Sequence, residues 1–277
     1  METAKTFAEL RTMRQRLAAP VGFVPTMGYL HEGHISLVQH ARAENAAVVV
    51  SIFVNPTQFG PREDFKKYPR DLPRDLALLA AAGTDLVFIP EAAEMYPPGF
   101  NAWVDVAGLT EKLEGASRPG HFRGVTTVVA KLFNLVTPDT AYFGQKDAQQ
   151  VAVIRKMVTD LNMDLKVATL PTVREPDGLA MSSRNTYLKP DERRAATILH
   201  KSLRLAERLY RKGERDARKI RRQMLTLLQA EPLADVDYVS IADNATLEEL
   251  AEITPPALVS LAVKIGRTRL IDNIVLE

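Results

Sequence analysis

Two histidines stand three residues apart in the segment Met27-Gly-Tyr-Leu-His31-Glu-Gly33-His34. Upstream, the apolar run 21–25 is typical of a buried strand, and downstream apolar residues recur at helical spacing, at Ile35, Leu37, Val38 and Ala41. The first turn of a helix presents unpaired N–H groups and the positive end of its dipole, which favours anions. Gly28 and Gly33 carry no Cβ, so a ligand can approach the backbone there. The turn therefore predicts a binding site for a nucleotide triphosphate.

Two histidines at this spacing could also be a metal pair, or surface residues at a helix start. A zinc site needs further His, Cys or carboxylate ligands at compatible spacing. The chain has no cysteine, and Glu32 is expected to point away from the two imidazoles. The other histidines, at positions 40, 121 and 200, have no partner at ligand spacing. We therefore favour the anion site and expect no metal ligands among these side chains.

The composition is typical of a globular protein with one large domain or two modest ones. The 277 residues are 46% hydrophobic and 25% charged, and the lack of cysteine excludes a disulfide framework. Residues 1–7 lack the layout of a signal peptide, and no apolar run approaches the roughly 18 residues that a membrane span needs. We expect a cytoplasmic protein without membrane contact.

The charge pattern gives little support for a nucleic-acid partner. The formal net charge is only +2, although residues 191–222 hold twelve Lys or Arg against five Asp or Glu. Apolar residues recur in this stretch at helical spacing, at Ile198, Leu199, Leu205, Ala206 and Leu209. The pattern favours the solvated face of an amphipathic helix over an RNA-binding face.

Strands and helices alternate over the first 170 residues. Strands are expected at 21–25, 47–54, 85–89, 140–143 and 164–170, and helices near 34–45, 71–82, 124–136 and 147–161. The alternation predicts an α/β fold, a Rossmann-like parallel sheet with helices on both faces. Ligands bind such sheets at the carboxyl ends of the strands, which is where the two histidines fall.

The pattern changes after about residue 175. Helices expected near 191–212 and 216–230 precede expected strands at 236–241, 258–263 and 269–275, with a hairpin around Gly266. This order predicts a small α+β C-terminal lid domain over 176–277, after a ligand-binding Rossmann-like domain over 1–175. The Pro and Gly of 174–178 suggest the hinge.

Four further segments place polar side chains at strand ends or in loops, where site residues concentrate. Asn55 and Gln58 follow the second strand, and their amides suit hydroxyl and carboxylate groups. Arg118 precedes a helix and suits a carboxylate or phosphate. By itself, each of these segments is also typical of an ordinary turn or capped loop.

The other two segments suit a polyphosphate. Lys146 follows a strand at a helix entry, where it can neutralise phosphate charge, and Gln150 lies one helical turn beyond it. Asp147 can hold a magnesium ion or a ribose hydroxyl. The hydroxyls and guanidinium of Met181-Ser182-Ser183-Arg184 can close over phosphates, although such a loop is common on protein surfaces.

Together, the early His-x-Gly-His turn and the later Met-Ser-x-basic loop resemble the HIGH/KMSKS nucleotidyltransferase superfamily. More closely, the chain resembles the pantoate–β-alanine ligase (pantothenate synthetase) family in six separated blocks between residues 25 and 188. The blocks are PTMGYLHEGH, SIFVNPTQFGPREDF, YPRD, RPGHFRGVTTVVAKLFN, FGQKDAQQ and MSSRNTYL. One departure from the superfamily pattern is informative, because residues 180–184 lack both lysines of the KMSKS loop. Lys146 and Arg184 are expected to supply that positive charge.

The resemblance implies two half-reactions in one site. The carboxylate of pantoate attacks the α-phosphorus of ATP to give pantoyl adenylate and pyrophosphate, and the amine of β-alanine then displaces AMP to form pantothenate. Such a reaction needs positioning and charge neutralisation rather than a covalent enzyme intermediate. The resemblance also implies Mg²⁺ bound mainly by phosphate oxygens, and a homodimer. It does not identify the group that deprotonates β-alanine.

The resemblance assigns roles residue by residue. His34, His31 and Lys146 are the expected catalytic residues, with His34 as the donor to the transition state. Gln58 and Gln150 are the expected pantoate or β-alanine contacts, with Asn55 and Arg118 as further candidates. The expected ATP-binding residues are Met27, Gly28, His31, His34, Gly144, Gln145, Lys146, Asp147, Val173, Met181, Ser182, Ser183 and Arg184.

Two other functions stay open from the sequence. A nucleotidyltransferase of the same superfamily would act on a phosphate acceptor and should need more basic residues in its pocket than the neutral Gln58 and Gln150. A nucleic-acid-binding protein would use 191–222 and show salt-sensitive binding, but it would leave the His-x-Gly-His turn unexplained.

Overall fold

The computed structural model describes residues 1–61 and 63–277, which form two compact units. Unit 1 comprises residues 1–144 and 153–170, and unit 2 comprises residues 145–152 and 171–277. The units differ from the predicted domains chiefly in grouping 145–152 with the C-terminal part of the chain. The predicted domain boundary itself stays a prediction.

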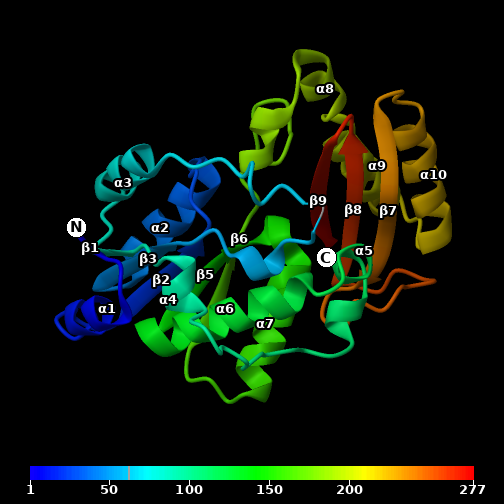
Figure 1. Cartoon of the computed structure of the whole chain (residues 1–277). Helices are drawn as coiled ribbons and strands as arrows, with labels where there is room; N and C mark the ends of the chain where they lie inside the picture. Colours follow the sequence, from blue (N-terminus) through cyan, green and yellow to red (C-terminus); the bar gives the residue numbers. More distant parts are fainter. Residues whose placement is uncertain (62) are drawn as a thin grey trace. The chain divides into compact units, whose positions relative to one another are not determined.

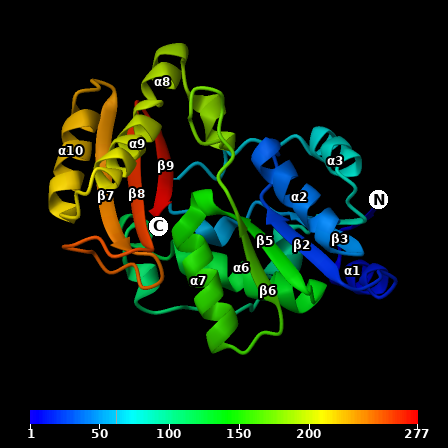
Figure 2. The ribbon, with the colours of Figure 1, turned by 180° about the vertical axis from the view of Figure 1, so that it is seen from behind.

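Unit 1 is built on a parallel sheet of six strands in the order β1-β4-β3-β2-β5-β6. Helices α2 (Glu32–Glu44) and α3 (Leu72–Ala81) lie on one face of this sheet, and α1 (Phe7–Arg14) and α6 (His121–Val136) lie on the other (Figure 1 and Figure 2). The strands are β1 (Glu2–Ala4), β2 (Val21–Thr26), β3 (Ala47–Ile52), β4 (Leu86–Phe88), β5 (Thr140–Gly144) and β6 (Lys166–Leu170).

The helices of unit 1 begin where local sequence signals allow. Thr6 and Glu9 form a reciprocal capping box at the first helix, and Asp71 caps the third, which has a proline in its first turn. The helices are α1 (Phe7–Arg14), α2 (Glu32–Glu44), α3 (Leu72–Ala81), α4 (Ala92–Met95), α5 (Glu114–Ser117) and α6 (His121–Val136), with α7 (Ala148–Asp160) passing from unit 2 into unit 1; η1 (Pro56–Gln58) and η2 (Leu109–Glu111) are 3₁₀ turns.

The central strands are apolar because both of their faces are covered. Successive side chains of a strand point to opposite faces, so Phe23 packs edge-on against Phe133 of α6, with ring centroids 6.3 Å apart. Its neighbour Val24 packs with Leu37 and Val38 of α2 in a cluster on the opposite face. Continuous apolar runs such as residues 21–25 are therefore what a doubly covered parallel strand requires.

The strand order places a topological switch point beside β2. The chain leaves β2 for β3 on one side, whereas β5 pairs with β2 on the other side. In open parallel sheets, ligands bind outside the carboxyl ends of the strands at such a point. The turn after β2 and the residues after β5 are therefore favoured positions for a ligand.

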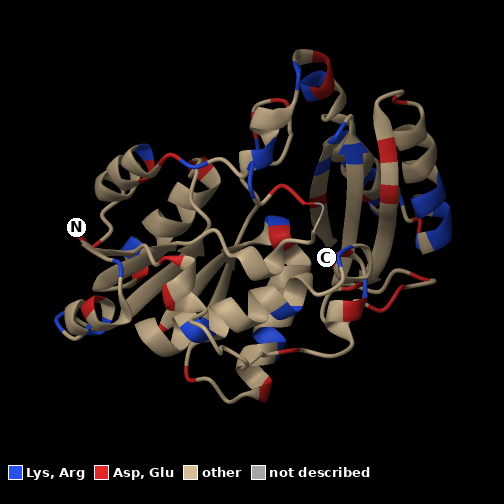
Figure 3. Cartoon of the chain, viewed as in Figure 1, with Lys and Arg blue, Asp and Glu red and all other residues tan. Residues whose placement is uncertain are grey.

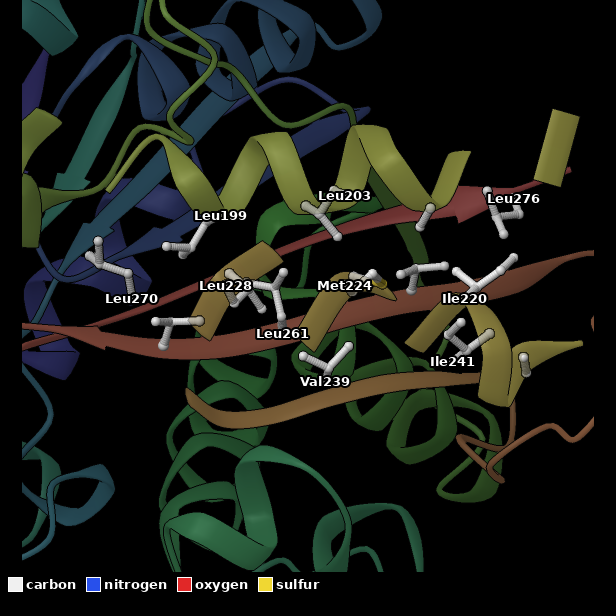
Figure 4. Packing of buried hydrophobic residues seen from close by; sticks show 14 of the residues in the cluster. Leu199, Leu203, Ile220, Met224, Leu228, Val239, Ile241, Leu261, Leu270 and Leu276 are labelled. Atoms are coloured by element: carbon white, nitrogen blue, oxygen red, sulfur yellow. The ribbon is translucent and has the colours of Figure 1, made fainter. Parts of the chain in front are cut away.

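Unit 2 has an antiparallel sheet in the order β7-β8-β9, packed against helices α9 and α10. Figure 4 shows the buried residues between them, among them Leu203, Met224 and Leu261. The predicted hairpin at Gly266 is confirmed, since Ile265 pairs with Thr268. The elements are η3 (Gln145–Asp147), η4 (Ser183–Tyr187), α8 (Pro190–Ala195), α9 (Ile198–Arg211), α10 (Ala217–Gln229), β7 (Ala234–Asp243), β8 (Ala257–Ile265) and β9 (Thr268–Leu276).

The predicted fold class is confirmed, a parallel sheet with helices on both faces plus a small α+β part. The single helix predicted over 191–212 is wrong, because the chain breaks into α8 and α9 around Thr197. The Thr197 hydroxyl donates to Arg194 O at 2.9 Å, a local bond that competes with continuous helix geometry. None of the helices in the described ranges is long and apolar enough to cross a membrane.

Most of the basic side chains in 191–222 are exposed, whereas apolar residues of the same stretch, such as Leu203, are buried. Lys and Arg gather on α10 and alternate with acidic residues on α8 (Figure 3). Many of them pair with nearby carboxylates: Arg204 and Arg211 with Glu207, Lys219 with Glu214, and Arg221 with Glu249. The arrangement agrees with the solvated amphipathic face that the sequence favours.

The packing of unit 2 predicts the effect of a core truncation. Leu203 on α9 is 0% exposed, so Leu203→Ala should lower the free energy of unfolding by about 3 kcal/mol through lost burial and a cavity. Leu233 is 40% exposed, and Leu233→Ala should cost less than about 1 kcal/mol. Urea unfolding of both variants measures the difference, and equal losses would contradict the assigned core.

Candidate functional site

The turn between β2 and α2 has a backbone conformation with positive φ, which few residue types other than glycine adopt readily. Gly28 has a φ of +79° and Tyr29 a φ of +50°, both in the left-handed region. A Cβ on Gly28 would lie 2.9 Å from Ile52 Cγ2 and 3.1 Å from Asp75 Oδ2. The sequence suggested that Gly28 leaves room for a ligand, and the structure adds that backbone conformation and tight packing both require glycine here.

Asp75 of α3 hydrogen-bonds to the backbone of this turn. Its carboxylate accepts the backbone N–H groups of Tyr29 at 2.7 Å and Leu30 at 2.8 Å, and Arg74 Nη1 donates to Leu30 O at 2.8 Å. Asp75 is 1% exposed, and burial raises the pKa of its carboxyl although the two N–H bonds oppose that rise. These bonds fix the backbone that leads into the histidines.

The two histidines occupy the start of α2. His31 is the N-cap residue and His34 is the third residue of the helix, with their ring centroids 4.0 Å apart. The His31 backbone N–H donates to His34 Nδ1 at 3.3 Å, so His34 Nδ1 acts as acceptor and a neutral imidazole carries its proton on Nε2. The arrangement gives one imidazole N–H donor beside a helix N-terminus at the carboxyl end of β2.

The amides predicted from the second strand lie beside this turn within unit 1. Gln58 Nε2 donates to Met27 Sδ at 3.2 Å, and Gln58 Oε1 accepts from Asn55 Nδ2 at 3.1 Å. The structure therefore brings Gln58 to the residue that begins the predicted nucleotide turn. This contact joins the expected substrate amide and the expected phosphate site.

Asn55 is buried and bonded to the protein. It is 1% exposed, and its Oδ1 accepts from the Thr57 and Tyr96 hydroxyls at 2.9 and 2.7 Å. Its Nδ2 also donates to Gly124 O at 3.1 Å. A Cβ on Gly124 would lie 2.4 Å from Thr57 O, so α6 packs directly on the backbone of η1. These contacts fix the Asn55 side chain beside Gln58, and its predicted contact with a ligand stays a prediction.

Arg118 is also bonded within the protein, next to the same turn. Its guanidinium donates two bonds of 2.7 Å to the Glu63 carboxylate. His121 bridges Arg118 and the backbone, with Nε2 3.0 Å from Arg118 Nη1 and Nδ1 2.8 Å from Gln58 O. Only a neutral ring can accept from Arg118 and donate to Gln58 O at once, and burial, then the Arg118 charge, lowers the pKa of His121 to about 4.

Gly144 ends β5 in unit 1, and the remaining predicted site residues belong to unit 2. Lys146 and Asp147 lie in η3, with Lys146 Nζ 3.6 Å from Asp147 Oδ1. Gln145 precedes them in the same turn, and Gln150 is half-buried in the first turn of α7.

The Ser-Ser-Arg loop and Val173 are neighbours within unit 2. The Met181 N–H donates to Val173 O at 3.0 Å, and Arg174 pairs with Ala180 in an antiparallel bridge. Ser182 caps η4 by accepting the Arg184 N–H at 3.3 Å, and Ser183 is buried. Val173, predicted to contact adenine, and residues 181–184, predicted to bind phosphates, are therefore joined by a backbone hydrogen bond.

Several residues that support the site carry no local sequence signal. Asp75, Glu63 and His121 contact the site turns from 45 to 63 residues away along the chain. An acidic residue in the first turn of a helix, such as Asp75, is ordinarily explained by the helix dipole. Within residues 1–61 and 63–277, no group of three or more His, Cys, Asp or Glu side chains is arranged to hold a metal ion.

Comparison with known proteins gives one consistent result. The family model described as Pantoate-beta-alanine ligase matches residues 2–275. The chain is 61% identical to pantothenate synthetase of Roseiflexus castenholzii over 277 residues, all of both chains. It resembles the crystal structure of pantothenate synthetase from Thermus thermophilus, with a TM-score of 0.95, 50% identity and 99% of each chain covered.

A second solved structure was determined with ligands. It is the pantoate-beta-alanine ligase of Francisella tularensis complexed with beta-gamma ATP and beta-alanine. Its TM-score to this chain is 0.82 at 35% identity, and the match covers 99% of this chain and 97% of that one.

The half-buried His121 predicts a pH dependence of stability. Its pKa of about 4 in the fold lies below the ordinary 6.5, so the unfolded chain binds more protons between these values. The contribution of His121, at most about 3 kcal/mol, should be present above pH 6.5 and be lost as the pH falls toward 4. Urea unfolding at about pH 7.5, 6 and 5 measures this loss.

His121→Gln should flatten the pH dependence, whereas the exposed His40→Gln on α2 should leave it intact. Burial also lowers the pKa of His200, so a smaller dependence in the same direction should persist in His121→Gln. An unchanged pH dependence in His121→Gln would show that this ring does not titrate with folding.

Proposed function

Because the chain belongs to the pantoate–β-alanine ligase family, we propose that it condenses pantoate with β-alanine to pantothenate at the expense of ATP. The proposed reaction has two steps. The pantoate carboxylate attacks the α-phosphorus of ATP and releases pyrophosphate, and the β-alanine amine then attacks the acyl carbon and releases AMP. Activation is necessary because a carboxylate is a poor electrophile toward the amine. Its negative charge is also repelled by the phosphates of ATP, so the site must neutralise charge.

The observation that carries this proposal is the contact between Gln58 and Met27. It places a neutral amide, suited to a hydroxyl- and carboxylate-bearing acid, beside the turn that suits a triphosphate. A carboxylate held by Gln58 would lie close to phosphates bound at the start of α2. A phosphate acceptor, as in other nucleotidyltransferases of the superfamily, would be served better by a cation than by this amide.

The phosphates are proposed to bind at Met27, Gly28, His31 and His34. The N-terminus of α2 supplies backbone N–H groups and the positive end of a helix dipole. Negative charge moves toward the pyrophosphate as the α-phosphorus is attacked. The Nε2–H of His34 is the proposed donor to that charge, and such donors act chiefly on the transition state.

The remaining ATP contacts are proposed for the β5 end and for unit 2. Gly144, Gln145, Lys146 and Asp147 would bind ribose and phosphate, with Lys146 as the cation. Val173 would contact the adenine through its backbone. Met181, Ser182, Ser183 and Arg184 would bind the phosphates, with Arg184 and Lys146 replacing the lysines of the KMSKS pattern.

Gln58 and Gln150 are the proposed contacts of pantoate. Asn55 and Arg118 are proposed as further contacts of the substrate, and both also bond to protein groups around Gln58. Arg118 Nη2 donates to Gln58 O at 3.3 Å, so the guanidinium charge of Arg118 lies beside the backbone of η1.

Mg²⁺ is proposed to accompany ATP and to neutralise phosphate charge. Mg²⁺ commonly binds substrate phosphates plus one or two carboxylates and keeps several waters. The half-exposed Asp147 carboxylate is one available protein ligand, and the described residues offer no preformed cluster of three. Phosphate oxygens would therefore supply most of the coordination.

The family resemblance also suggests a homodimer in the cytoplasm, which we retain as proposals. No nucleic-acid partner is proposed, because the formal net charge is only +2 and several cations of the unit 2 helices pair with carboxylates. Sedimentation velocity tests the dimer directly.

Oxygen labelling tests the proposed reaction. The pantoate carboxylate oxygen that attacks phosphorus leaves with AMP, so carboxyl-¹⁸O-labelled pantoate should transfer one ¹⁸O atom to each AMP. Mass spectrometry of the products measures the transfer. Unlabelled AMP, or the appearance of ADP and phosphate, would contradict attack at the α-phosphorus.

His34→Ala should lower the rate of pyrophosphate release about 100-fold or more, because a donor to the transition state is lost. Rapid-quench measurement of pyrophosphate in a single turnover reports this step. The exposed His40→Ala, on the same helix, should leave the rate unchanged. Normal release in His34→Ala would remove His34 from the mechanism.

Gln58→Ala should raise the KM for pantoate about 10- to 100-fold, the range expected for losing a hydrogen bond to a charged ligand. The KM for ATP should change far less. Steady-state kinetics with each substrate varied in turn measure both constants, with the exposed Gln39→Ala as control. A larger effect on ATP than on pantoate would reverse the pocket assignment.

A further inference from the structure

We propose that Asn273, on the last strand of the chain, is a positioning residue for Lys146. Asn273 is 4% exposed and lies in the interior of β9. Its Nδ2 donates to Gln145 O at 3.0 Å and to Lys146 O at 2.8 Å, and its Oδ1 accepts from Gln145 Nε2 at 3.1 Å. One side-chain amide thus forms three hydrogen bonds with the turn that carries Lys146.

The turn needs such support because it is short. η3 consists of only three residues, and 3₁₀ turns have poorer hydrogen-bond geometry than α-helices. Both amide protons of Asn273 are used on consecutive carbonyls, which fixes the direction of the backbone at Lys146. A lysine on such a turn can then present its ammonium group with less loss of conformational freedom.

The strand that carries Asn273 is well fixed. β9 pairs with β8 over nine residues, and Asn273 lies opposite Ser260 in that register. Side chains alternate along a strand, and Leu270 and Leu276 pack into the core under α9 and α10. Asn273 therefore points to the other face of the sheet, where η3 lies.

The neighbouring residue Asp272 fixes a second segment. It is 2% exposed, and its carboxylate accepts from Arg174 Nη1 at 2.6 Å and Nη2 at 2.9 Å. Arg174 directly follows Val173, whose carbonyl accepts the Met181 N–H. Two adjacent residues of β9 thus fix both parts of unit 2 to which ATP contacts are assigned.

The inference rests on the proposed function of Lys146, and a double-mutant cycle separates the two. Asn273→Ala should lower kcat/KM for ATP about 10- to 100-fold, because misplacement of a charged group by about 1 Å can cost that much. In a Lys146→Ala background, the same change should cost less than about threefold, because the group it positions is already absent. The control Ser260→Ala, at the paired register position, should leave kcat/KM unchanged.

Equal losses from Asn273→Ala in both backgrounds would mean a general structural role and overturn the inference. Reduced activity in Lys146→Ala with full activity in Asn273→Ala would overturn the inference alone. Full activity in Lys146→Ala would overturn the proposed role of Lys146 and this inference with it. If Asn273→Ala does not fold, judged by its thermal unfolding, Asn273→Ser replaces it in the cycle with the same expected outcomes.

Discussion

Two backbone N–H bonds to the buried Asp75 carboxylate determine where the turn after β2 can lie. Gly28 and Tyr29 both have positive φ, and for the non-glycine residue Tyr29 this conformation is strained and persists only where surrounding contacts enforce it. Asp75 supplies those contacts at 2.7 and 2.8 Å, and Gly28 fits closely between Ile52 and Asp75. The start of α2, and with it His31 and His34, follows from that arrangement. An anion site made of backbone N–H groups depends on such preorganisation, because its donors must already point at the ligand.

The same design recurs at the other assigned positions. His121 and Arg118 hold the carbonyl of Gln58, and Asn273 holds the carbonyls at Lys146. In each case a partly or fully buried polar side chain hydrogen-bonds to the backbone of a short turn. The side chain proposed to bind the ligand does not itself have to hold that backbone. The charges are balanced locally, as in the Glu63–Arg118 pair. The proposed chemistry requires little else from the protein, since adenylation depends on positioning and charge neutralisation.

Much of the architecture could be predicted because local hydrophobic patterns in the sequence indicate the strands and helices. The doubly covered strands are apolar runs, and the helices show one buried face, so their order predicts a parallel sheet followed by an α+β part. β1 was not predicted, since it has only three residues and two are exposed. α1 was also missed, although its Thr6–Glu9 capping box is a local signal that could have located it. The break at Thr197 depends on a side-chain bond within the chain that periodicity does not reveal.

Candidate site residues could be proposed from the sequence where they follow strands and where family motifs cover them. Its supporting residues were not, because the bonds of Asp75, His121 and Asn273 span 45, 63 and 127 or more residues. The sequence suggested Asn55 and Arg118 as ligand contacts from their residue types, and only the structure shows their bonds to protein groups. Residue type alone does not distinguish a polar side chain that binds a ligand from one that binds the backbone beside it.

In the proposed reaction, a carboxylic acid held at Gln58 attacks the α-phosphorus of a nucleotide held at the start of α2. Exchange of labelled pyrophosphate into ATP, without β-alanine, measures that reversible step most directly. We expect exchange that begins only when pantoate is added. Exchange that is absent with pantoate and Mg²⁺ present, or equally fast without pantoate, would contradict the proposed reaction.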